Sequence, residues 1–270
     1  MGDQDMELSS DQSDAAAEQA LIVRFGMAMT IAGESIDEVG ERLTQLADAR
    51  GVRDISVVVL PTALFVQTAE AGTVRVQLDA FPNRHLRLDQ IGDLYDLLHR
   101  AEARDLDALD ALDEIDRILG SAPMYGPLVR TLGIGVLSIG FALTLQPTPE
   151  DVAIAFVLGV FVGLLRLLRV PGLQAVLPVL ATFAVAALVF STTDDIGGTN
   201  PLRTLIPPLV TFLPGAVLTT GMRDLSSGQV VSGSSRLVQG IVVLALLAFG
   251  IVAAATLVGA PPTHLLDRPV

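Results

Sequence analysis

The sequence predicts a mainly α-helical membrane protein, in which a small cytoplasmic α+β module precedes five transmembrane helices. Of the 270 residues, 51% are hydrophobic and only 17% are charged, and the mean hydropathy is +0.57. This is too apolar for an ordinary soluble chain of this length. The charges are also unevenly distributed, because 24 of the 30 Asp and Glu residues precede Ser121. An acidic first part and a nearly neutral, apolar second part indicate a water-exposed module joined to a membrane domain, and argue against a nucleic-acid partner.

Several residue types that carry enzyme chemistry are missing. The sequence has no cysteine, which excludes disulfides, thiolate metal sites and cysteine nucleophiles. It also has no lysine, which excludes Schiff-base chemistry and the lysine of a phosphate-binding loop. The three histidines, His85, His99 and His264, lie far apart and form no metal-spaced pair. We therefore expect no enzyme activity, no cofactor and no metal site.

The N-terminal part is divided into an acidic tail and a folded module. Residues 1–20 contain six acidic side chains and no basic one, which is unlike a secretory signal peptide. We expect residues 1–13 to form a disordered tail. The module is expected to occupy residues 14–121.

The module begins with two predicted helices. The first covers residues 15–32 and is interrupted at Gly33. Ser35 and Glu38 have the spacing of a capping box, in which each side chain accepts a hydrogen bond from the backbone of the other. They start the second helix, and Gly51 is well placed to end it.

Three strands and further helices complete the module. Segments 55–60, 63–67 and 74–78 are short and β-branched or alternating, which predicts an antiparallel meander. Helical periodicity returns over residues 91–98 and 109–118. The many carboxylates of these helices are interpreted as a solvated face, because no nucleophile, Gly-rich phosphate loop or histidine accompanies them at a recognisable spacing.

The membrane domain, residues 122–260, contains five apolar stretches. A helix needs about 20 residues to cross the hydrocarbon core of a bilayer. The predicted spans are approximately 128–145, 152–168, 173–190, 202–218 and 237–258. More arginines lie on one side of the predicted spans than on the other, which places the N-terminal module, on the arginine-rich side, in the cytoplasm. The arginine-rich side has Arg117, Arg130, Arg166, Arg169, Arg223 and Arg236, and the other side has Arg203 and Arg268. The short tail, residues 261–270, is then extracytoplasmic.

The second span carries two local signals. Gly159 and Gly163 form a small-xxx-small face, which is expected to pack against another helix. Glu150 and Asp151 lie at its start, where their charge complements the helix dipole. We interpret these carboxylates as caps in preference to a proton relay.

The fourth span is irregular and is the predicted substrate pathway. Prolines interrupt it, and broken helices at membrane depth are tolerated where they are buried in protein or line a wet cavity, as in transporters. A polar, Gly-rich link follows, in which Arg223 and Asp224 are candidates for a gate or coupling pair. The alternative is that the prolines only kink the helix and that Arg223 is a positive-inside anchor. The predicted pathway residues are Pro207, Pro208, Thr211, Pro214, Gly215, Thr219, Thr220, Arg223, Asp224, Ser227, Gly228 and Arg236.

The order of these motifs resembles the threonine/serine exporter family. The similarity rests on the segments 32–39, 60–62 and 86–89 of the module and on the five spans that follow. More specific is the series Leu213-Pro214-Gly215, Gly221-Met222-Arg223-Asp224-Leu225, Ser227-Gly228, and Ser232-Gly233 to Arg236-Leu237. The resemblance covers nearly the whole chain beyond the acidic tail.

The resemblance implies secondary transport: export of L-threonine and L-serine across the plasma (inner) membrane, driven by the proton motive force. Members of the family have ten spans in one chain or two separate subunits, so five spans imply one half of a transporter. A second small membrane subunit or a homo-oligomer would complete it, and amino-acid substrate and lipid are the other partners. The alternatives are a dicarboxylate exporter subunit of the same family, and a membrane-anchored sensor or scaffold whose module binds a ligand.

Overall fold

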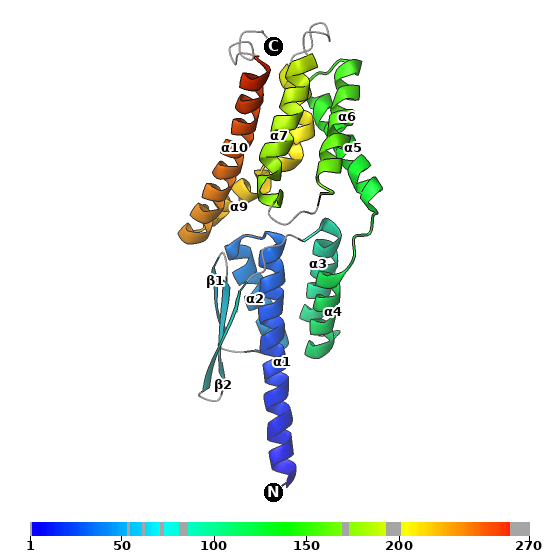
Figure 1. Cartoon of the computed structure of the whole chain (residues 1–270). Helices are drawn as coiled ribbons and strands as arrows, with labels where there is room; N and C mark the ends of the chain where they lie inside the picture. Colours follow the sequence, from blue (N-terminus) through cyan, green and yellow to red (C-terminus); the bar gives the residue numbers. More distant parts are fainter. Residues whose placement is uncertain are drawn as a thin grey trace. The chain divides into compact units, whose positions relative to one another are not determined.

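The computed structural model describes residues 2–52, 55–60, 63–70, 73–80, 86–168, 173–192 and 201–259 (Figure 1). The protein is mainly helical and divides into two compact units. The first unit comprises Met1–Ala122 together with Ala216–Val238, and the second comprises Pro123–Gly215 with Gln239–Val270. The predicted features at Pro61, Thr62, His85, Arg169 and residues 261–270 lie outside the described residues.

Helix α1 (Gly2–Ala32) forms the centre of the first unit. It is longer than the predicted helix and includes residues 2–13, which were predicted as a tail. Leu21, Ile22, Phe25 and Met29 are fully buried in the core that α1 shares with the other helices and the sheet. The apolar character of α1 therefore serves the core of this unit.

The strands form one antiparallel sheet in the order β1-β2-β3, as the sequence predicts. The strands are β1 (Ile55–Leu60), β2 (Ala63–Glu70) and β3 (Thr73–Ala80). Leu64 and Val66 of β2 are fully buried against the core, with their alternating neighbours more exposed. The period of two is that of a strand with one covered face.

Helix α2 (Ile36–Arg50) has the predicted ends. The backbone N–H of Glu38 donates to Ser35 Oγ at 3.3 Å, and Gly51 ends the helix in the left-handed region with φ 78°. The reciprocal bond of the predicted capping box is replaced. The Glu38 carboxylate instead accepts hydrogen bonds from Arg42 and Arg223, because charged donors bind a carboxylate more strongly than a neutral N–H.

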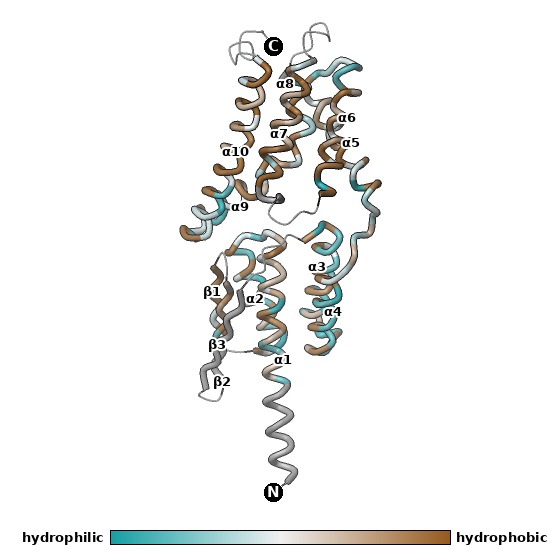
Figure 2. Tube along the Cα trace, in the orientation of Figure 1, coloured by the Kyte–Doolittle hydropathy of each residue, from teal (hydrophilic) through white to brown (hydrophobic). Residues whose placement is uncertain are grey.

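Two further helices complete the N-terminal part of the first unit: α3 (Leu88–Glu102) and α4 (Ala108–Gly120). They pack against each other and against α1 through buried leucine, isoleucine and alanine side chains. Figure 2 shows that both helices mix hydrophilic and hydrophobic residues along their length. This is the pattern of helices with one covered face.

The second unit is built from apolar helices. They are α5 (Pro127–Thr144), α6 (Pro149–Leu165), α7 (Leu173–Thr192), α8 (Pro201–Leu209), the 3₁₀ turn η1 (Val210–Phe212) and the part of α10 (Val230–Val258) beyond residue 238. Figure 2 shows α7 and this part of α10 as hydrophobic over most of their length.

Small residues bring α5 and α6 into close contact. A Cβ atom on Gly163 would lie 2.9 Å from Cγ2 and 3.1 Å from the carbonyl oxygen of Thr131, and one on Gly159 would collide with Ser138. The start of α6 is capped by reciprocal bonds, from Thr148 N to Asp151 Oδ2 at 2.9 Å and from Asp151 N to Thr148 Oγ1 at 3.2 Å. Asp151 therefore acts as a cap, which is the role the sequence favours.

Three described helices are long and apolar enough to cross a membrane: Asp14–Ala32, Pro127–Thr144 and Val230–Val258. A fourth is added if the bent pair Arg203–Phe212 and Gly215–Ser226 counts as one span. The first of these is the core helix of the first unit. Helix α6 has 17 residues and α7 has 20, and Val176–Ser191 of α7 forms a shorter apolar helix.

Two expectations about the fourth span and its link need correction. The prolines Pro207 and Pro208 lie inside α8, and the helix is interrupted later, at Leu213 and Pro214. The following polar segment is largely helical, because α9 (Gly215–Ser226) and the start of α10 leave only a short turn between them. Its glycines serve close packing: a Cβ atom on Gly233 would lie 2.7 Å from the carbonyl oxygen of Gly221.

Candidate functional site

The centre of the candidate site is Asp224, a fully buried carboxylate on α9 within the first unit. Its Oδ1 accepts a hydrogen bond of 2.9 Å from the backbone N–H of Ile36. Ile36 is the first residue of α2, where the backbone N–H groups have no partner within the helix and the helix dipole is positive. Asp224 therefore occupies the favourable position for an anion at this helix end.

Arg236 of α10 neutralises the buried carboxylate. Its Nε lies 3.3 Å from Asp224 Oδ2, an ion pair without hydrogen-bond geometry, so that Oδ2 has no hydrogen-bond partner. The other two nitrogens donate to backbone carbonyls, Nη1 to Gly33 at 3.1 Å and Nη2 to Glu34 at 2.7 Å. The guanidinium of Arg236, which belongs to α10, thus connects the loop after α1 with Asp224 of α9. The side chain is only 16% exposed.

A second ion pair lies beside the first but is exposed to solvent. Arg223 Nη2 donates to Glu38 Oε2 at 2.9 Å, and the Arg223 side chain is 59% exposed. Glu38 also accepts from Arg42, and this hydrogen bond raises the pKa of the Arg42 guanidinium. Because exposed pairs contribute about 0–1 kcal/mol, Arg223 adds little stability and the buried pair dominates.

Tyr95 of α3 is a further titratable group near this cluster. Burial raises the pKa of its hydroxyl, and a hydrogen bond to Glu34 raises the pKa further. The hydroxyl therefore stays protonated over the ordinary pH range and donates to Glu34. The backbone carbonyl of Glu34 accepts a hydrogen bond from Arg236, so Tyr95 helps to hold the loop that binds the guanidinium of Arg236.

Glycines allow Asp224 and Arg236 to meet. A Cβ atom on Gly221 would lie 3.1 Å from Cβ of Arg236 and 3.1 Å from the carbonyl oxygen of Gly233. The two helices therefore approach to backbone contact where the ion pair forms. Ser232, one turn before Arg236 on α10, is buried and its Oγ has no hydrogen-bond partner.

The broken helix of the second unit carries another polar contact. Arg166, just after α6, donates from Nη2 to the carbonyl oxygen of Thr211 at 2.7 Å. Its guanidinium also lies over the Phe212 ring, 4.5 Å from the centroid. These contacts hold the 3₁₀ turn that precedes Pro214.

The predicted pathway residues fall into two groups in the structure. Arg223, Asp224 and Arg236 come together in the first unit, where Ser227 Oγ donates to the carbonyl oxygen of Asp224 at 3.1 Å. Gly228 adopts φ 85° in the turn between α9 and α10, and Thr219 and Thr220 lie on α9. Pro207, Pro208, Thr211, Pro214 and Gly215 belong to the second unit.

Sequence reasoning did not include the residues that receive Asp224 and Arg236. These are Gly33, Glu34 and Ile36. Sequence reasoning also assigned no site role to Tyr95, which binds Glu34, or to Arg166, which binds Thr211 in the second unit. A signal was present, because the segment around residues 33–38 and the segment around residues 223–236 both belong to the family resemblance. Their contact could not be predicted from either segment alone.

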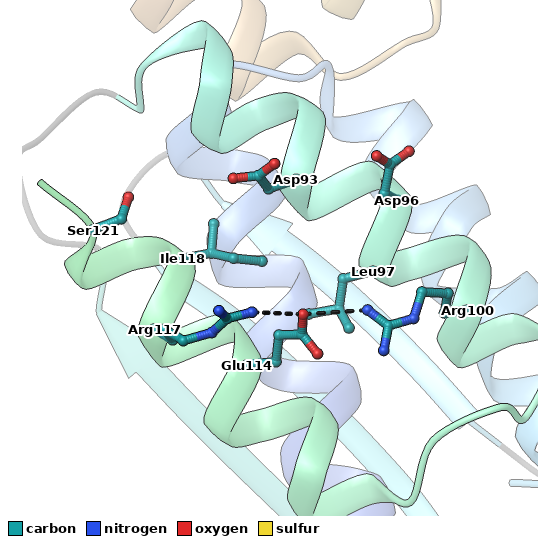
Figure 3. Close-up of a pocket in the computed structure, with 8 residues that line it drawn as sticks. All are labelled: Asp93, Asp96, Leu97, Arg100, Glu114, Arg117, Ile118 and Ser121. Atoms are coloured by element: carbon teal, nitrogen blue, oxygen red, sulfur yellow. Dashed lines mark hydrogen bonds and ion pairs between the residues drawn. The ribbon is translucent and has the colours of Figure 1, made fainter. Parts of the chain in front are cut away.

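An open pocket of about 380 Å³ lies between α3 and α4 (Figure 3). Glu114 Oε1 at its centre accepts hydrogen bonds from Arg100 at 3.2 Å and Arg117 at 2.8 Å. Asp93 and Asp96 line the α3 side (Figure 3). Over the described parts of the chain, no group of three or more His, Asp or Glu side chains could hold a metal ion. We interpret the pocket as a solvated ion-pair network that joins the two helices.

Comparison with known proteins identifies a family. A family model described as "Putative threonine/serine exporter" matches residues 20–258. This range includes the loop after α1, α2, α9, α10 and the broken helix, and so all the contacts of Asp224. No curated protein and no solved structure matches the chain.

Proposed function

Because the chain belongs to the threonine/serine exporter family, we propose that it exports L-threonine and L-serine across the plasma membrane, driven by the proton motive force. The family and the apolar helices indicate a membrane location. A secondary transporter needs a pathway for substrate and a group that responds to the coupling ion. The observation that carries the proposal is the buried pair of Asp224 and Arg236.

Asp224 has the chemistry of a coupling carboxylate. As an anion it is held by the Ile36 N–H and by Arg236; negative charge strengthens the first contact, and the ion pair depends on it. A proton on Oδ2, which has no hydrogen-bond partner, would remove that charge and leave Arg236 beside a neutral group. Breaking a buried pair in this way is costly, so protonation favours separation of α9 and α10 from α2. Proton binding and movement of the helix after the break at Pro214 are thereby linked.

We further propose that the chain is one half of the transporter. Five spans, corresponding to α5, α6, α7, the α8 to α9 segment and α10, would place the N-terminal α+β module in the cytoplasm and the C-terminus outside. The arginine distribution supports this orientation. A second small membrane subunit, or a second copy of this chain, would supply the remaining helices.

The test is export from living cells. Cells that lack this chain, and any partner encoded beside it, are fed a threonine-containing dipeptide, and intracellular and external L-threonine are measured. We expect retention of threonine in the deletion strain and recovery with the wild-type chain. Equal efflux with and without the chain would refute the proposal.

A variant pair separates a transporter from an anchored sensor. Asp224→Asn should abolish recovery of export, whereas Glu150→Gln, which changes an exposed carboxylate at the start of α6, should preserve it. Equal recovery by both variants would favour the sensor or scaffold.

A further inference from the structure

Two arginines gather at one end of the α5–α6 hairpin in the second unit. Arg130 lies in the first turn of α5, and Arg166 follows the last turn of α6. The helices run antiparallel, since Thr131 packs against Gly163 and Ser138 packs against Gly159. Arg130 is close enough for its charge to act on Arg166. Among the described residues, neither arginine forms an ion pair with a carboxylate.

Arg166 is held in place by the break in the neighbouring helix. In a 3₁₀ turn the carbonyl of Thr211 would accept from the residue three positions later, which is Pro214 and has no N–H. Arg166 Nη2 satisfies this carbonyl at 2.7 Å, and Phe212 supports the guanidinium plane. Arg166 uses one N–H group for this carbonyl, and its other N–H groups have no hydrogen-bond acceptor among the described residues.

Two buried hydroxyls lack partners in the same region. Thr131 Oγ1 follows Arg130 on α5, and Thr211 Oγ1 belongs to the residue whose carbonyl binds Arg166; neither has a hydrogen-bond partner. Buried polar groups are normally satisfied, so these two unpaired hydroxyls, one next to Arg130 in the sequence and one on the residue that binds Arg166, call for an explanation. An oxyanion supplies one, because it accepts hydrogen bonds and neutralises both arginines.

We propose that Arg130, Arg166 and the hydroxyls of Thr131 and Thr211 form the binding site for the carboxylate of the transported substrate. The proposal rests on the proposed export function and adds a recognition element to it. Arginine suits this role because its planar fork binds both oxygens of a carboxylate. The position beside the broken helix places the bound anion next to the segment that leads to Asp224 along the chain.

The first test compares ligands on the purified full-length chain. L-threoninamide keeps the ammonium and hydroxyl groups of L-threonine but has no carboxylate. We expect wild-type protein to bind L-threonine more tightly than L-threoninamide. Arg130→Gln and Arg166→Gln should each weaken L-threonine binding about tenfold to hundredfold, the range for a hydrogen bond between charged groups. They should leave the weak binding of L-threoninamide unchanged.

Arg203→Gln is the matched control. Arg203 is also an arginine of the second unit, and it donates to the carbonyl oxygen of Gln146 at 3.3 Å. Its substitution should not change the preference for L-threonine. Arg130→Gln leaves the bond between Arg166 and Thr211 in place, and so it tests the site even if Arg166→Gln disturbs the broken helix.

The outcomes tell failure of the carboxylate site apart from failure of the proposed substrate. If the arginine variants bind L-threonine as the wild type does, the carboxylate site is wrong while threonine export can still hold. If wild-type protein does not bind L-threonine or L-serine but binds succinate, and Arg130→Gln and Arg166→Gln weaken succinate binding, the proposed substrate is wrong and the carboxylate site is supported. If the variants lose only co-purified phosphatidylglycerol, the arginines bind lipid phosphate and the proposal is overturned.

Discussion

Asp224 accepts a hydrogen bond from the backbone N–H of Ile36, which lies 188 positions earlier in the sequence. This bond brings the Arg-Asp segment of α9 to the first turn of α2. Arg236 completes the arrangement by pairing with Asp224 and by binding the carbonyls of the loop before α2. Two segments that are far apart in the sequence thus form one buried, charged contact.

Removal of one partner from the buried ion pair between Asp224 and Arg236 should destabilise the first unit. Asp224→Asn leaves Arg236 without its counter-charge, and we expect a loss of about 3–5 kcal/mol in the free energy of unfolding. Arg223→Gln, at the exposed pair, should cost no more than about 1 kcal/mol. The measurement is denaturant unfolding of the purified chain in detergent. A cycle with Arg236→Gln should show coupling of about 0.5–3 kcal/mol with Asp224, and additive effects would contradict a direct pair.

A proline at position 36 tests the hydrogen bond to Asp224 in isolation. Ile36 is the first residue of α2, where proline is well tolerated but offers no N–H. We expect Ile36→Pro to reduce export more than Ile36→Ala, which removes the same buried side chain and keeps the N–H. Threonine efflux from complemented cells gives the comparison. Equal loss in both variants would assign the effect to packing alone.

Glycine substitutions in the second unit should have opposite effects. Gly163→Ala places a Cβ 2.9 Å from Thr131 and forces α5 and α6 apart, which should destabilise by about 1–3 kcal/mol. Gly133→Ala on α5 meets nothing within 4 Å and should stabilise by up to about 1 kcal/mol through helix propensity. Melting temperatures of the two variants in one detergent are compared. A lower melting temperature for Gly133→Ala than for Gly163→Ala would contradict this packing.

The Tyr95 hydroxyl should titrate at unusually high pH. The chain has two tyrosines and no tryptophan, so the Tyr125→Phe variant leaves Tyr95 as the only phenol. Burial and Glu34 raise its pKa above the ordinary value of about 10. The stability that Tyr95 contributes is complete below pH about 10 and is lost as the pH rises from there toward its folded-state pKa.

Absorbance at 295 nm follows this ionisation, and denaturant unfolding between pH 9 and 11, a range of about one unit around the ordinary value, follows the stability. Tyr95→Phe should remove this component of the alkaline loss. A phenol in the Tyr125→Phe variant that titrates at the ordinary value would show that Tyr95 is neither buried nor bonded to Glu34.

The sequence predicted the elements that depend on local signals. Ser35 and Gly51 mark the ends of α2, and alternation identifies the strands, because caps and strand periodicity are set by neighbouring residues. The family was also predicted correctly. The helical form of the segment after Pro214 was missed, because its glycines suggest a loop although they serve close packing of α9 and α10.

The site was predicted only in part. Arg223, Asp224 and Arg236 were identified as charged residues of the polar link between two predicted spans. The partners of Asp224 and Arg236, at the start of α2 and in the loop before it, are distant in sequence and use backbone atoms. No side-chain pattern reports a backbone N–H as a partner. The role of Arg166 was hidden for a similar reason, since it compensates for the missing N–H of Pro214 by binding the carbonyl of Thr211.

The most direct test of the account is transport of labelled L-threonine by the full-length chain in liposomes, together with its partner subunit if the adjacent gene encodes one. Wild-type protein should exchange internal for external threonine and should accumulate it further when a pH gradient is imposed. Asp224→Asn should retain exchange and lose the response to the gradient, because an asparagine amide at this position cannot take up and release a proton. Absence of threonine and serine movement by wild-type protein, or a full gradient response in Asp224→Asn, would contradict the account.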